Sequence, residues 1–553
     1  MEADGSYRRG VELHRQGRPV EAVRAFFRAL ALAPDFVPAL TDLAALMHQM
    51  GQTTLALACL RRALRRGPFR ADDLVSLASM LHWSGRTAEA LAAIERLLAV
   101  EPTHGRGLLD HAMLSLPVMA SDIAEAERAV AQFDSRLARL CGPAAAGCLT
   151  TAWGQSLPFY AAYRQGNQRP RLQAYGRLVS SSMAACFPTP AGPPPPRSRR
   201  RLAIVSNHLR RHSIWDVLLH GLLIHIDRSR FEVVLLNTMA LADGETERAR
   251  GLCERFHSCL TFESAMEALA GERPDIIYYP EIGMDAVTAR LAGLRLAPLQ
   301  TAGWGHPLTS GLPEIDLFFS GEQMEGPDAQ DHYSERLVRL PGTGAFTVMP
   351  PVAALPLDGP DWPGDPRRID IALCQNPYKF DPAHDHLYAE LAAALPDSRF
   401  WMLFEPSRLD LYRILHRRLQ TAFQDRGQDL ERRMAWRPWL PRPQFMTFLQ
   451  RSSFALDCPG FSGYTTAWQA LHCGLPLVTW EGPQMRQKMA AGLLREIGET
   501  DTIAQSATDY LAIAVRLAGE ADKDRRRQRL RAAIGATDNR LEVVRAFEQA
   551  ISL

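Results

Sequence analysis

The chain has 553 residues, more than one hydrophobic core usually serves, and this length predicts about three domains. Its 63 basic residues nearly cancel 61 acidic residues, and the formal charge of +2 provides no general field for nucleic acid or an anionic membrane. The first residues, MEADGSYRRG, lack the apolar core of a secretory signal, and no apolar run reaches the ~18 residues of a membrane helix. We therefore expect a cytoplasmic protein without a nucleic-acid or membrane partner.

Nine cysteines are scattered along the chain between Cys59 and Cys473, and they form no CxxC pair. Zinc clusters and disulfide frameworks need closely and regularly spaced cysteines. We expect most of these residues to be reduced and to pack as small apolar side chains.

The N-terminal part of the chain repeats with a period of 34 residues. Small residues let two helices approach, large apolar residues fill the space between them, glycine permits the turn and proline ends the second helix. The pattern resembles the tetratricopeptide repeat and predicts a helical solenoid over residues 1–102, whose concave surface holds a peptide or partner. A helical scaffold without a ligand is the alternative. The matched positions are Leu13, Met47 and Leu81; Gly17, Gly51 and Gly85; Ala22, Ala56 and Ala90; Phe26, Leu60 and Ile94; and Pro34, Pro68 and Pro102.

Helical patterning continues beyond the repeats without a clear period, and it predicts a helical bridge that ends in a linker, over residues 103–200. The proline-rich stretch 187–201 cannot form a helix, because proline lacks an amide donor and restricts the residue before it. Its arginines are interpreted as part of a solvated linker, with phosphate contact as the alternative.

Short β-rich runs separated by amphipathic segments follow Arg201, and this alternation predicts parallel strands joined by helical crossovers. A proline- and glycine-rich stretch divides the series into an N-lobe (201–349), an interlobe linker (350–368) and a C-lobe (369–553). We predict an α plus α/β protein in which a two-lobed, GT-B-like region binds its ligand at the carboxyl ends of the strands. A two-lobed dehydrogenase or a nucleotide-sugar epimerase would show the same alternation, although no GxGxxG or P-loop motif supports a dinucleotide or P-loop site.

The segment DCPGFSGYTTAWQALHCGLPLVT, residues 457–479, predicts a strand, a glycine-containing loop, a helix and a second strand. The helix is expected to begin near Thr465 and Thr466. A diphosphate there would meet unpaired backbone amides, two hydroxyls and the positive end of the helix dipole. Simple N-capping by the threonines is the structural alternative.

The segment CQNPYKFDP, residues 374–382, places Asn376 and Lys379 just beyond the first strand of the same lobe. An ammonium group at that rim can neutralise the charge that develops on a departing nucleoside diphosphate. An ordinary surface lysine is the alternative, but arginine dominates the basic residues of this chain and lysines are few.

The repeats, together with AIVSNHLRRH, APLQTAGWGHPLTSG, CQNPYKFDP and SGYTTAWQALHCGLPLVT, resemble the O-GlcNAc transferase and SPINDLY family of GT-B glycosyltransferases. The resemblance implies an inverting, metal-independent transfer from a sugar nucleotide, first of all UDP-GlcNAc or a similar hexose donor, to a protein held by the repeats. It implies no cofactor and suggests an enzyme of bacterial type. Repeat arrays often dimerise, so a homodimer is among the expected assemblies.

The same resemblance assigns roles to residues of this chain. His212 corresponds to a histidine near the acceptor and sugar, and His306 matches the histidine of the related adhesin N-glucosyltransferases, where O-GlcNAc transferases have tyrosine. Either histidine would orient the acceptor or accept its proton, and either has a structural role as its alternative. The residues implied at the nucleotide and its phosphates are Asn376, Lys379, Tyr464, Thr465 and Thr466, with Tyr464 in place of a family histidine.

One position departs from the family pattern. Gln469 stands where the family has an acidic residue that accepts the ribose hydroxyls. A glutamine carbonyl still accepts a hydrogen bond, but without charge assistance. The resemblance still makes uridine the first choice of nucleotide, and the departure at Gln469 leaves guanosine and cytidine sugars as alternatives.

Three functional alternatives accompany O-linked transfer to serine or threonine. The His306 segment points to N-linked transfer to asparagine, and Gln469 points to a non-catalytic repeat adaptor with a degenerate transferase region. Transfer to a small molecule or polysaccharide, with the repeats serving only for assembly, is the third.

Overall fold

The computed structural model describes residues 2–67, 70–142, 149, 152, 154, 156–189, 192–349, 354–358 and 361–552. Over these ranges, no helix has both the length and the apolar character needed to cross a bilayer. The chain forms two compact units. The first contains Met1–Ala120, Ala124–Ala152 and Glu405–Ile414, and the second contains Ser121–Ile123, Trp153–Phe404 and Leu415–Leu553.

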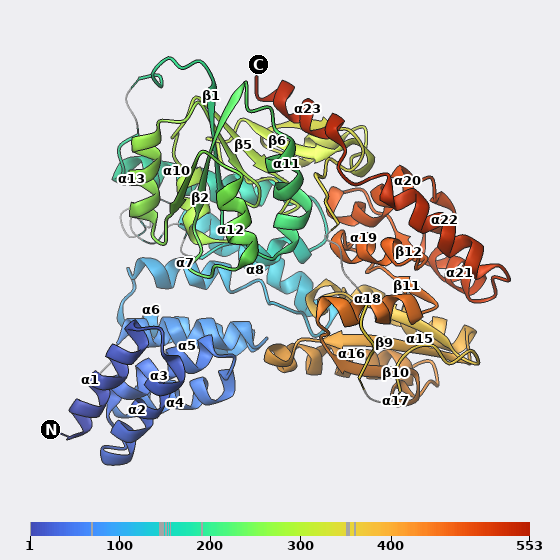
Figure 1. Cartoon of the computed structure of the whole chain (residues 1–553). Helices are drawn as coiled ribbons and strands as arrows, with labels where there is room; N and C mark the ends of the chain where they lie inside the picture. The colour runs from blue at the N-terminus through green and yellow to red at the C-terminus, as the bar shows by residue number, and fades with distance from the viewer. Residues whose placement is uncertain are drawn as a thin grey trace. The chain divides into compact units, whose positions relative to one another are not determined.

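Three antiparallel helix pairs build the repeats, drawn in blue in Figure 1. The repeated alanines at 22, 56 and 90 are fully buried between paired helices. Gly17, Gly51 and Gly85 turn the chain within each pair with φ of 71°, 75° and 73°, a conformation that glycine adopts without strain. The predicted solenoid is therefore confirmed, while Pro68 lies outside the described residues. The helices are α1 (Glu2–Arg15), α2 (Pro19–Leu32), α3 (Val37–Gln49), α4 (Thr53–Arg66), α5 (Ala71–Trp83) and α6 (Thr87–Val100).

The predicted helical bridge contains α7 (Gly105–Met113), α8 (Ile123–Leu140), the short 3-10 helix η1 (Phe159–Tyr163) and α10 (Arg169–Cys186). In the proline-rich segment that follows, whose residues 190–191 lie outside the described ranges, Arg197 donates to the backbone oxygens of Glu272 and Arg273. Arg197 is thus bound to the first lobe, and the interpretation of these arginines as part of a solvated linker stays a prediction.

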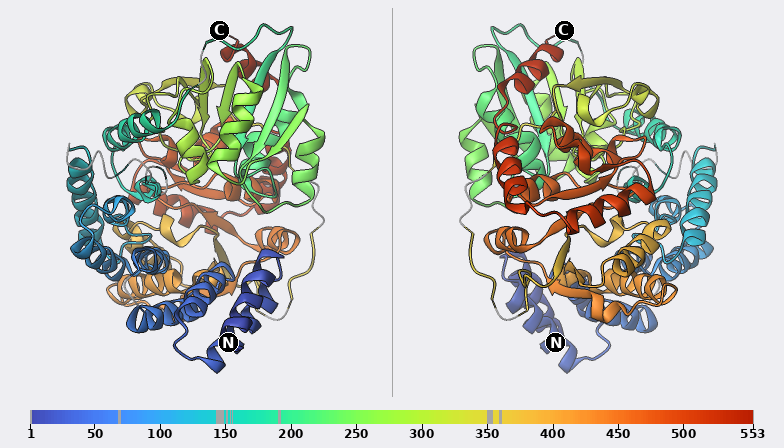
Figure 2. Two further views of the ribbon diagram at one scale, coloured as in Figure 1. Left: turned by 90° about the vertical axis from the view of Figure 1, so that its left-hand side faces the viewer. Right: turned by 90° about the vertical axis from the view of Figure 1, so that its right-hand side faces the viewer.

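The first lobe contains a seven-stranded parallel sheet with the order β3-β2-β1-β4-β5-β6-β7. Figure 2 shows its green strands beside the helices that connect them. The strands are β1 (Arg200–Ser206), β2 (Phe231–Asn237), β3 (Arg255–Ser258), β4 (Ile276–Tyr279), β5 (Leu299–Gly303), β6 (Leu317–Gly321) and β7 (Arg336–Leu340). The connecting helices are the π-helix η2 (Trp215–Leu219), α11 (His220–His225), α12 (Gly244–Gly251), α13 (Phe262–Glu272) and α14 (Ala286–Ala292).

The second lobe contains a six-stranded parallel sheet with the order β10-β9-β8-β11-β12-β13. Two parallel sheets after a helical solenoid confirm the predicted fold class. The strands are β8 (Ile369–Leu373), β9 (Ser398–Phe404), β10 (Met434–Pro438), β11 (Phe454–Leu456), β12 (Leu477–Trp480) and β13 (Ile503–Ala504). The helices are α15 (Asp385–Ala394), α16 (Leu409–Gln424), α17 (Leu430–Arg433), α18 (Arg442–Arg451), α19 (Thr465–His472), α20 (Met489–Glu496), α21 (Ala507–Ala518) and α22 (Lys523–Gly535).

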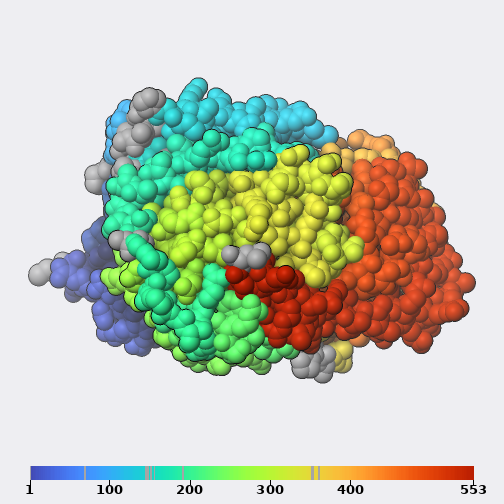
Figure 3. Space-filling model, turned by 90° about the horizontal axis from the view of Figure 1, so that it is seen from above, coloured from blue at the N-terminus to red at the C-terminus, as the bar shows by residue number. Residues whose placement is uncertain are grey.

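The last helix, α23 (Leu541–Ala550), returns to the first lobe. Its Phe547 is fully buried, with its ring centroid 4.7 Å from that of Phe319 and 5.2 Å from that of Tyr278. Figure 3 shows the red C-terminal segment against the green and yellow atoms of that lobe. The range predicted for the C-lobe, 369–553, thus includes a helix that packs on the other lobe. The other predicted boundaries stay predictions, and residues 350–353 and 359–360 of the predicted interlobe linker lie outside the described ranges.

Truncation of this anchor should destabilise the first lobe. Phe547→Ala removes a buried ring and leaves a cavity, so we expect a loss of about 3–5 kcal/mol in the free energy of unfolding. The measurement is urea denaturation followed by circular dichroism. Phe27→Ala, the same change at a half-exposed ring, serves as the control. Equal unfolding midpoints for the two variants would contradict this role of α23.

Candidate functional site

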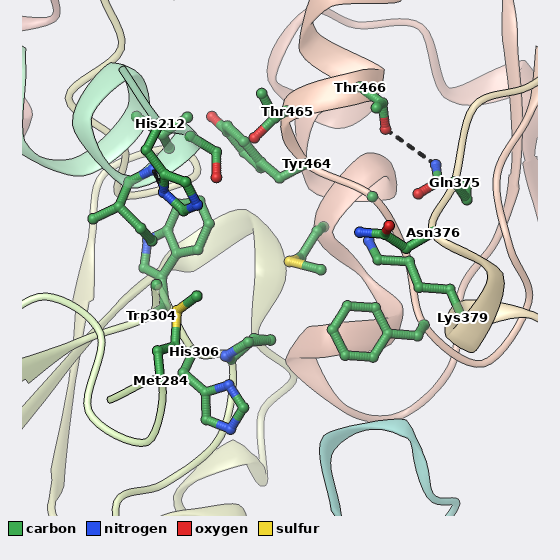
Figure 4. Close-up of a pocket in the computed structure, with 18 of the residues that line it drawn as sticks. His212, Met284, Trp304, His306, Gln375, Asn376, Lys379, Tyr464, Thr465 and Thr466 are labelled. Atoms are coloured by element: carbon green, nitrogen blue, oxygen red, sulfur yellow. Dashed lines mark hydrogen bonds between the residues drawn. The ribbon is translucent and has the colours of Figure 1, made fainter. Parts of the chain in front are cut away.

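A cavity of about 310 Å³ is lined by segments that follow the carboxyl ends of strands in both sheets. The first lobe contributes residues after β1, β4 and β5, and the second contributes residues after β8, β11 and β12. Figure 4 shows His212, Trp304 and His306 on one side of the cavity, opposite Gln375, Asn376 and Lys379. Seven of the eight predicted site residues line the cavity: His212, His306, Asn376, Lys379, Tyr464, Thr465 and Thr466.

The loop between β11 and α19 is organised by one buried carboxylate, Asp457, which sequence reasoning missed. One of its oxygens accepts from the backbone N–H of Gly463 at 2.8 Å and from Gln375 Nε2 at 3.2 Å. The other accepts from the hydroxyls of Ser462 and Thr479. Burial raises the pKa of Asp457, and the bonds from Ser462 and Gly463 and the charge of Lys379 oppose that rise. Four donors thus fix the approach of the chain to α19.

Helix α19 begins at Thr465, where the sequence predicted it. The first backbone N–H groups of a helix have no partner within it, so they and the two threonine hydroxyls offer an anion site. Gln375 Nε2 donates to Thr466 Oγ1 at 3.1 Å, which orients that hydroxyl (Figure 4). Gln375 is a second residue that sequence reasoning missed, although it adjoins the predicted Asn376.

Lys379 is the single lysine or arginine among the described residues that line the cavity, and none of those residues is aspartate or glutamate. Its Nζ donates to the backbone oxygen of Ser462 at 3.1 Å and lies 4.6 Å from the centroid of the Phe461 ring. Burial lowers the pKa of Lys379, while the nearby Asp457 raises it. A cavity with one cation and no carboxylate in its lining suits an anionic ligand.

His212 lies on the loop after β1, and its Nδ1 accepts a hydrogen bond from the backbone N–H of Ile214 at 3.2 Å. The neutral ring therefore carries its proton on Nε2. Burial, with contributions from His208 and Arg210, lowers the pKa of His212 to about 3. A neutral imidazole with this tautomer donates a hydrogen bond, and so weak a base accepts a proton poorly at neutral pH.

The ring of His208, a residue that sequence reasoning also missed, packs against the ring of His212. The two rings stack with centroids 3.9 Å apart and planes inclined by 28°. Glu281, just after β4, orients the His208 ring by accepting from His208 Nδ1 at 3.3 Å, and it also accepts from Ser206 Oγ at 2.6 Å. The position of His212 therefore depends on a buried network within the first lobe.

His306 is 8% exposed and stacks on Phe159 with ring centroids 5.2 Å apart. Burial, and to a smaller degree Arg486, lowers the pKa of His306 to about 4. This ring is also neutral at physiological pH. At neutral pH both histidines are therefore weak bases.

An aromatic wall from η1 also faces the cavity and was not predicted. Phe159 and Tyr163 line it, and the Tyr163 ring stacks on Phe461 with centroids 4.5 Å apart. Tyr378 meets the edge of Tyr163 at 4.8 Å. Residues of η1 in the bridge thus contact rings of both lobes along one wall of the cavity.

Tyr464 and Gln469 occupy different places relative to the cavity. Tyr464 lines it, and the Tyr464 hydroxyl lies 2.9 Å from Thr343 Oγ1 of the first lobe. Gln469 is buried one turn further along α19 and is not among the described lining residues. The expected contact of Gln469 with a ribose thus gains no support from its position.

The fold and the site define a two-lobed α/β protein of the GT-B type. Residues 370–549 match the sequence profile of glycosyl transferase family 41, and residues 13–81 match that of a tetratricopeptide repeat. The resemblance inferred from the sequence motifs is thereby confirmed.

Curated relatives share this similarity at low identity. A probable UDP-N-acetylglucosamine–peptide N-acetylglucosaminyltransferase SPINDLY from Solanum lycopersicum is 24% identical over 56% of this chain and 33% of its own length. A UDP-glucose:protein N-beta-glucosyltransferase from Actinobacillus pleuropneumoniae is 24% identical over 44% of this chain and 38% of its own. The chain therefore spans about a third of the length of the SPINDLY relatives.

Among solved structures, a mutant O-GlcNAc transferase from Thermobaculum terrenum superposes with a TM-score of 0.73. The match covers 99% of this chain and 96% of that chain, at 23% identity. At this identity the match establishes the fold alone.

Asp457 provides a direct test of the anion site. Asp457→Asn replaces one acceptor oxygen by an NH2 group that faces donors, so we expect the affinity for a nucleoside diphosphate to fall about tenfold or more. Isothermal titration calorimetry measures this change. Asp370→Asn, at a buried carboxylate that bonds Gly364 and Trp401 instead, is the matched control and should keep the affinity. Equal affinities in both variants would exclude Asp457 from organising the site.

The stacking of His208 on His212 predicts that substitution of His208 changes the titration of His212. In the native protein the pKa of His212 is about 3, so its ring should stay neutral from pH 5 to pH 8. His208→Gln removes the electrostatic contribution of His208, which lowers the pKa of His212, so that pKa should rise above about 3 while burial still keeps it below its ordinary ~6.5. NMR of labelled histidine rings follows the titration, with His306 as the internal reference. An unchanged His212 signal in the variant would show that His208 has no such effect.

Proposed function

We propose that this protein is a glycosyltransferase that moves a sugar from a nucleoside-diphosphate sugar to a protein side chain. The observation that carries the proposal is the cavity itself. Lys379 and the start of α19 at Thr465 form an anion site in the second lobe, and two neutral histidines face it from the first. The similarity to family 41 and to protein glycosyltransferases supports the same reaction class.

The proposed step is an in-line displacement at the anomeric carbon. The acceptor oxygen or nitrogen forms a new bond from the face opposite the diphosphate, and the bond between the anomeric carbon and the diphosphate breaks with its electron pair leaving on oxygen. The configuration inverts. Lys379, Thr465 and Thr466 stabilise the charge on that oxygen, which is the place where charge increases most in the transition state.

The acceptor proton needs a destination other than a carboxylate, because no aspartate or glutamate is among the described lining residues. The lowered pKa values of His212 and His306 make either ring a poor acceptor. A phosphate oxygen of the donor is the remaining base, and the Nε2–H of His212 orients the reacting groups. We expect the reaction to need no metal, because the described cavity lining offers no carboxylate ligand for a hard cation.

A UDP-sugar, with UDP-GlcNAc or a similar hexose donor first, is the donor that the motifs favour. The repeats are proposed to hold the acceptor protein, so that its side chain meets the donor sugar in a defined orientation. Serine or threonine is the preferred acceptor. The buried His306 at the cavity wall is the one observation that favours transfer to asparagine instead.

Donor and acceptor are tested by a panel of nucleoside diphosphates and their sugars. A ligand at 100 times its dissociation constant should stabilise the protein by about 2.7 kcal/mol in a thermal-shift assay. Mass spectrometry of acceptors from a lysate then distinguishes O-linked from N-linked sugar. A response to no member of the panel would support the adaptor alternative and contradict the transferase.

Lys379→Met tests the leaving-group role within that assay. We expect kcat for nucleoside-diphosphate release to fall about 100- to 1,000-fold, the size of effect seen when one preorganised donor to a developing oxyanion is removed. Lys523→Met, on α22 and outside the cavity lining, is the control. Retention of the native kcat by the Lys379 variant would contradict the assigned role.

A further inference from the structure

One ion pair joins the two lobes of the second unit beside the His212 loop. Asp216 belongs to η2 of the first lobe, and Arg442 is the first residue of α18 in the second lobe. Arg442 Nη2 lies 2.5 Å from Asp216 Oδ2. Asp216 is 5% exposed, so Arg442 pairs with a carboxylate that is almost completely buried.

The backbone of η2 connects this pair to the cavity. The N–H of Asp216 donates to the backbone oxygen of His212 at 3.1 Å, and the next two residues, Val217 and Leu218, line the cavity. The oxygen of Val217 accepts from the N–H of Phe346 at 2.8 Å, which ties η2 to the segment after β7. A displacement of Asp216 therefore displaces His212 and part of the cavity wall.

The opposite charges of Asp216 and Arg442 favour the arrangement of the lobes in which the two side chains are in contact. Burial raises the pKa of Asp216, Arg442 lowers it, and Glu245 and Arg211 act more weakly from α12 and the His212 loop. Loss of Arg442 alone would leave the buried carboxylate without the cation that compensates its burial. A buried charge without its partner is strongly unfavourable, so in this arrangement of the lobes each residue depends on the other.

We propose that Asp216 and Arg442 are positioning residues whose ion pair holds the lobes in the geometry that brings His212 opposite Lys379 and Thr465. The inference rests on the proposed transferase function. It adds that alignment between the lobes depends on this contact, whereas binding of the diphosphate depends on second-lobe residues alone. The pair itself does not contact the reacting atoms.

Because alignment of the lobes and binding of the diphosphate depend on different residues, loss of the ion pair should affect turnover and affinity differently. Loss of the pair should leave the affinity for a nucleoside diphosphate within twofold of the native value. Turnover should fall about 10- to 100-fold, because a shift of the order of one ångström between reacting groups has such an effect. A residue with a merely structural role would lower binding and turnover together.

The test is a double-mutant cycle with Asp216→Asn, Arg442→Gln and the double variant. If the two residues act only through each other, the double variant should lose no more turnover than the weaker single variant. Arg442→Lys keeps the charge and should restore part of the turnover. Arg426→Gln, which breaks the more exposed surface pair with Glu390, is the matched control and should behave like the native protein.

Three results would overturn the inference. Additive losses in the double variant would show that the residues act separately. Unchanged turnover in both single variants would show that the pair is dispensable, and a large loss of diphosphate affinity in Arg442→Gln alone would make Arg442 a ligand-binding residue. Failure of the proposed function is distinct, because the native protein would then respond to no nucleotide sugar at all.

Discussion

The candidate site depends on a single buried carboxylate at the end of β11. Asp457 accepts four hydrogen bonds, from Gln375, Ser462, Gly463 and Thr479. These donors come from the connection after β8, the connection after β11 and strand β12, and Lys379 is bound to the β11–α19 loop through the Ser462 oxygen. Because each buried donor needs its acceptor, the carboxylate fixes the distance between the lysine and the start of α19. The anion site is therefore built before any ligand arrives.

The electrostatics of the cavity follow from what surrounds that loop. With one lysine and no carboxylate among the described lining residues, nothing in the lining stabilises a protonated histidine. Burial then determines the state of both rings, and the pKa of His212 falls to about 3 and that of His306 to about 4. The same absence of carboxylates that suits an anionic ligand thus leaves both rings neutral.

The sequence predicted the parts of the fold that are encoded locally. The 34-residue period predicted the repeats, and the β-rich runs recognised in the sequence after Arg201 correspond to nine strands: β1, β2, β4, β5, β6, β8, β9, β11 and β12. The four strands that were missed, β3, β7, β10 and β13, are the edges of the two sheets. An edge strand is covered on fewer sides than a central strand, so it needs no continuous apolar run, and the alternation of segments does not reveal it. The return of α23 to the first lobe was likewise hidden, because Phe547 meets Tyr278 and Phe319 only after the chain has folded.

The same limit applies to the site. Lys379, Thr465 and Thr466 were predicted because each lies in a connection that follows a strand, where local order indicates the position. Asp457 was passed over although it directly follows β11, since a carboxylate that only accepts from N–H and hydroxyl groups of the protein has no motif of its own. Gln469 was assigned to the ribose by family correspondence. It lies four residues along α19 from Thr465 and is not among the described residues that line the cavity, so its role stays a prediction.

The aromatic wall shows why the bridge is part of the site and more than a spacer. Phe159 stacks on His306 of the first lobe, and Tyr163 stacks on Phe461 of the second, so one short helix is packed against a ring from each lobe. Aromatic pairs of this kind stabilise a contact beyond the apolar area that they bury. The ion pair between Asp216 and Arg442 constrains the lobes at the His212 loop, whereas η1 constrains them at His306 and Phe461. Two contacts at separate segments define the relative orientation of two bodies far better than one, and the proposed transfer between groups on opposite lobes requires a defined orientation.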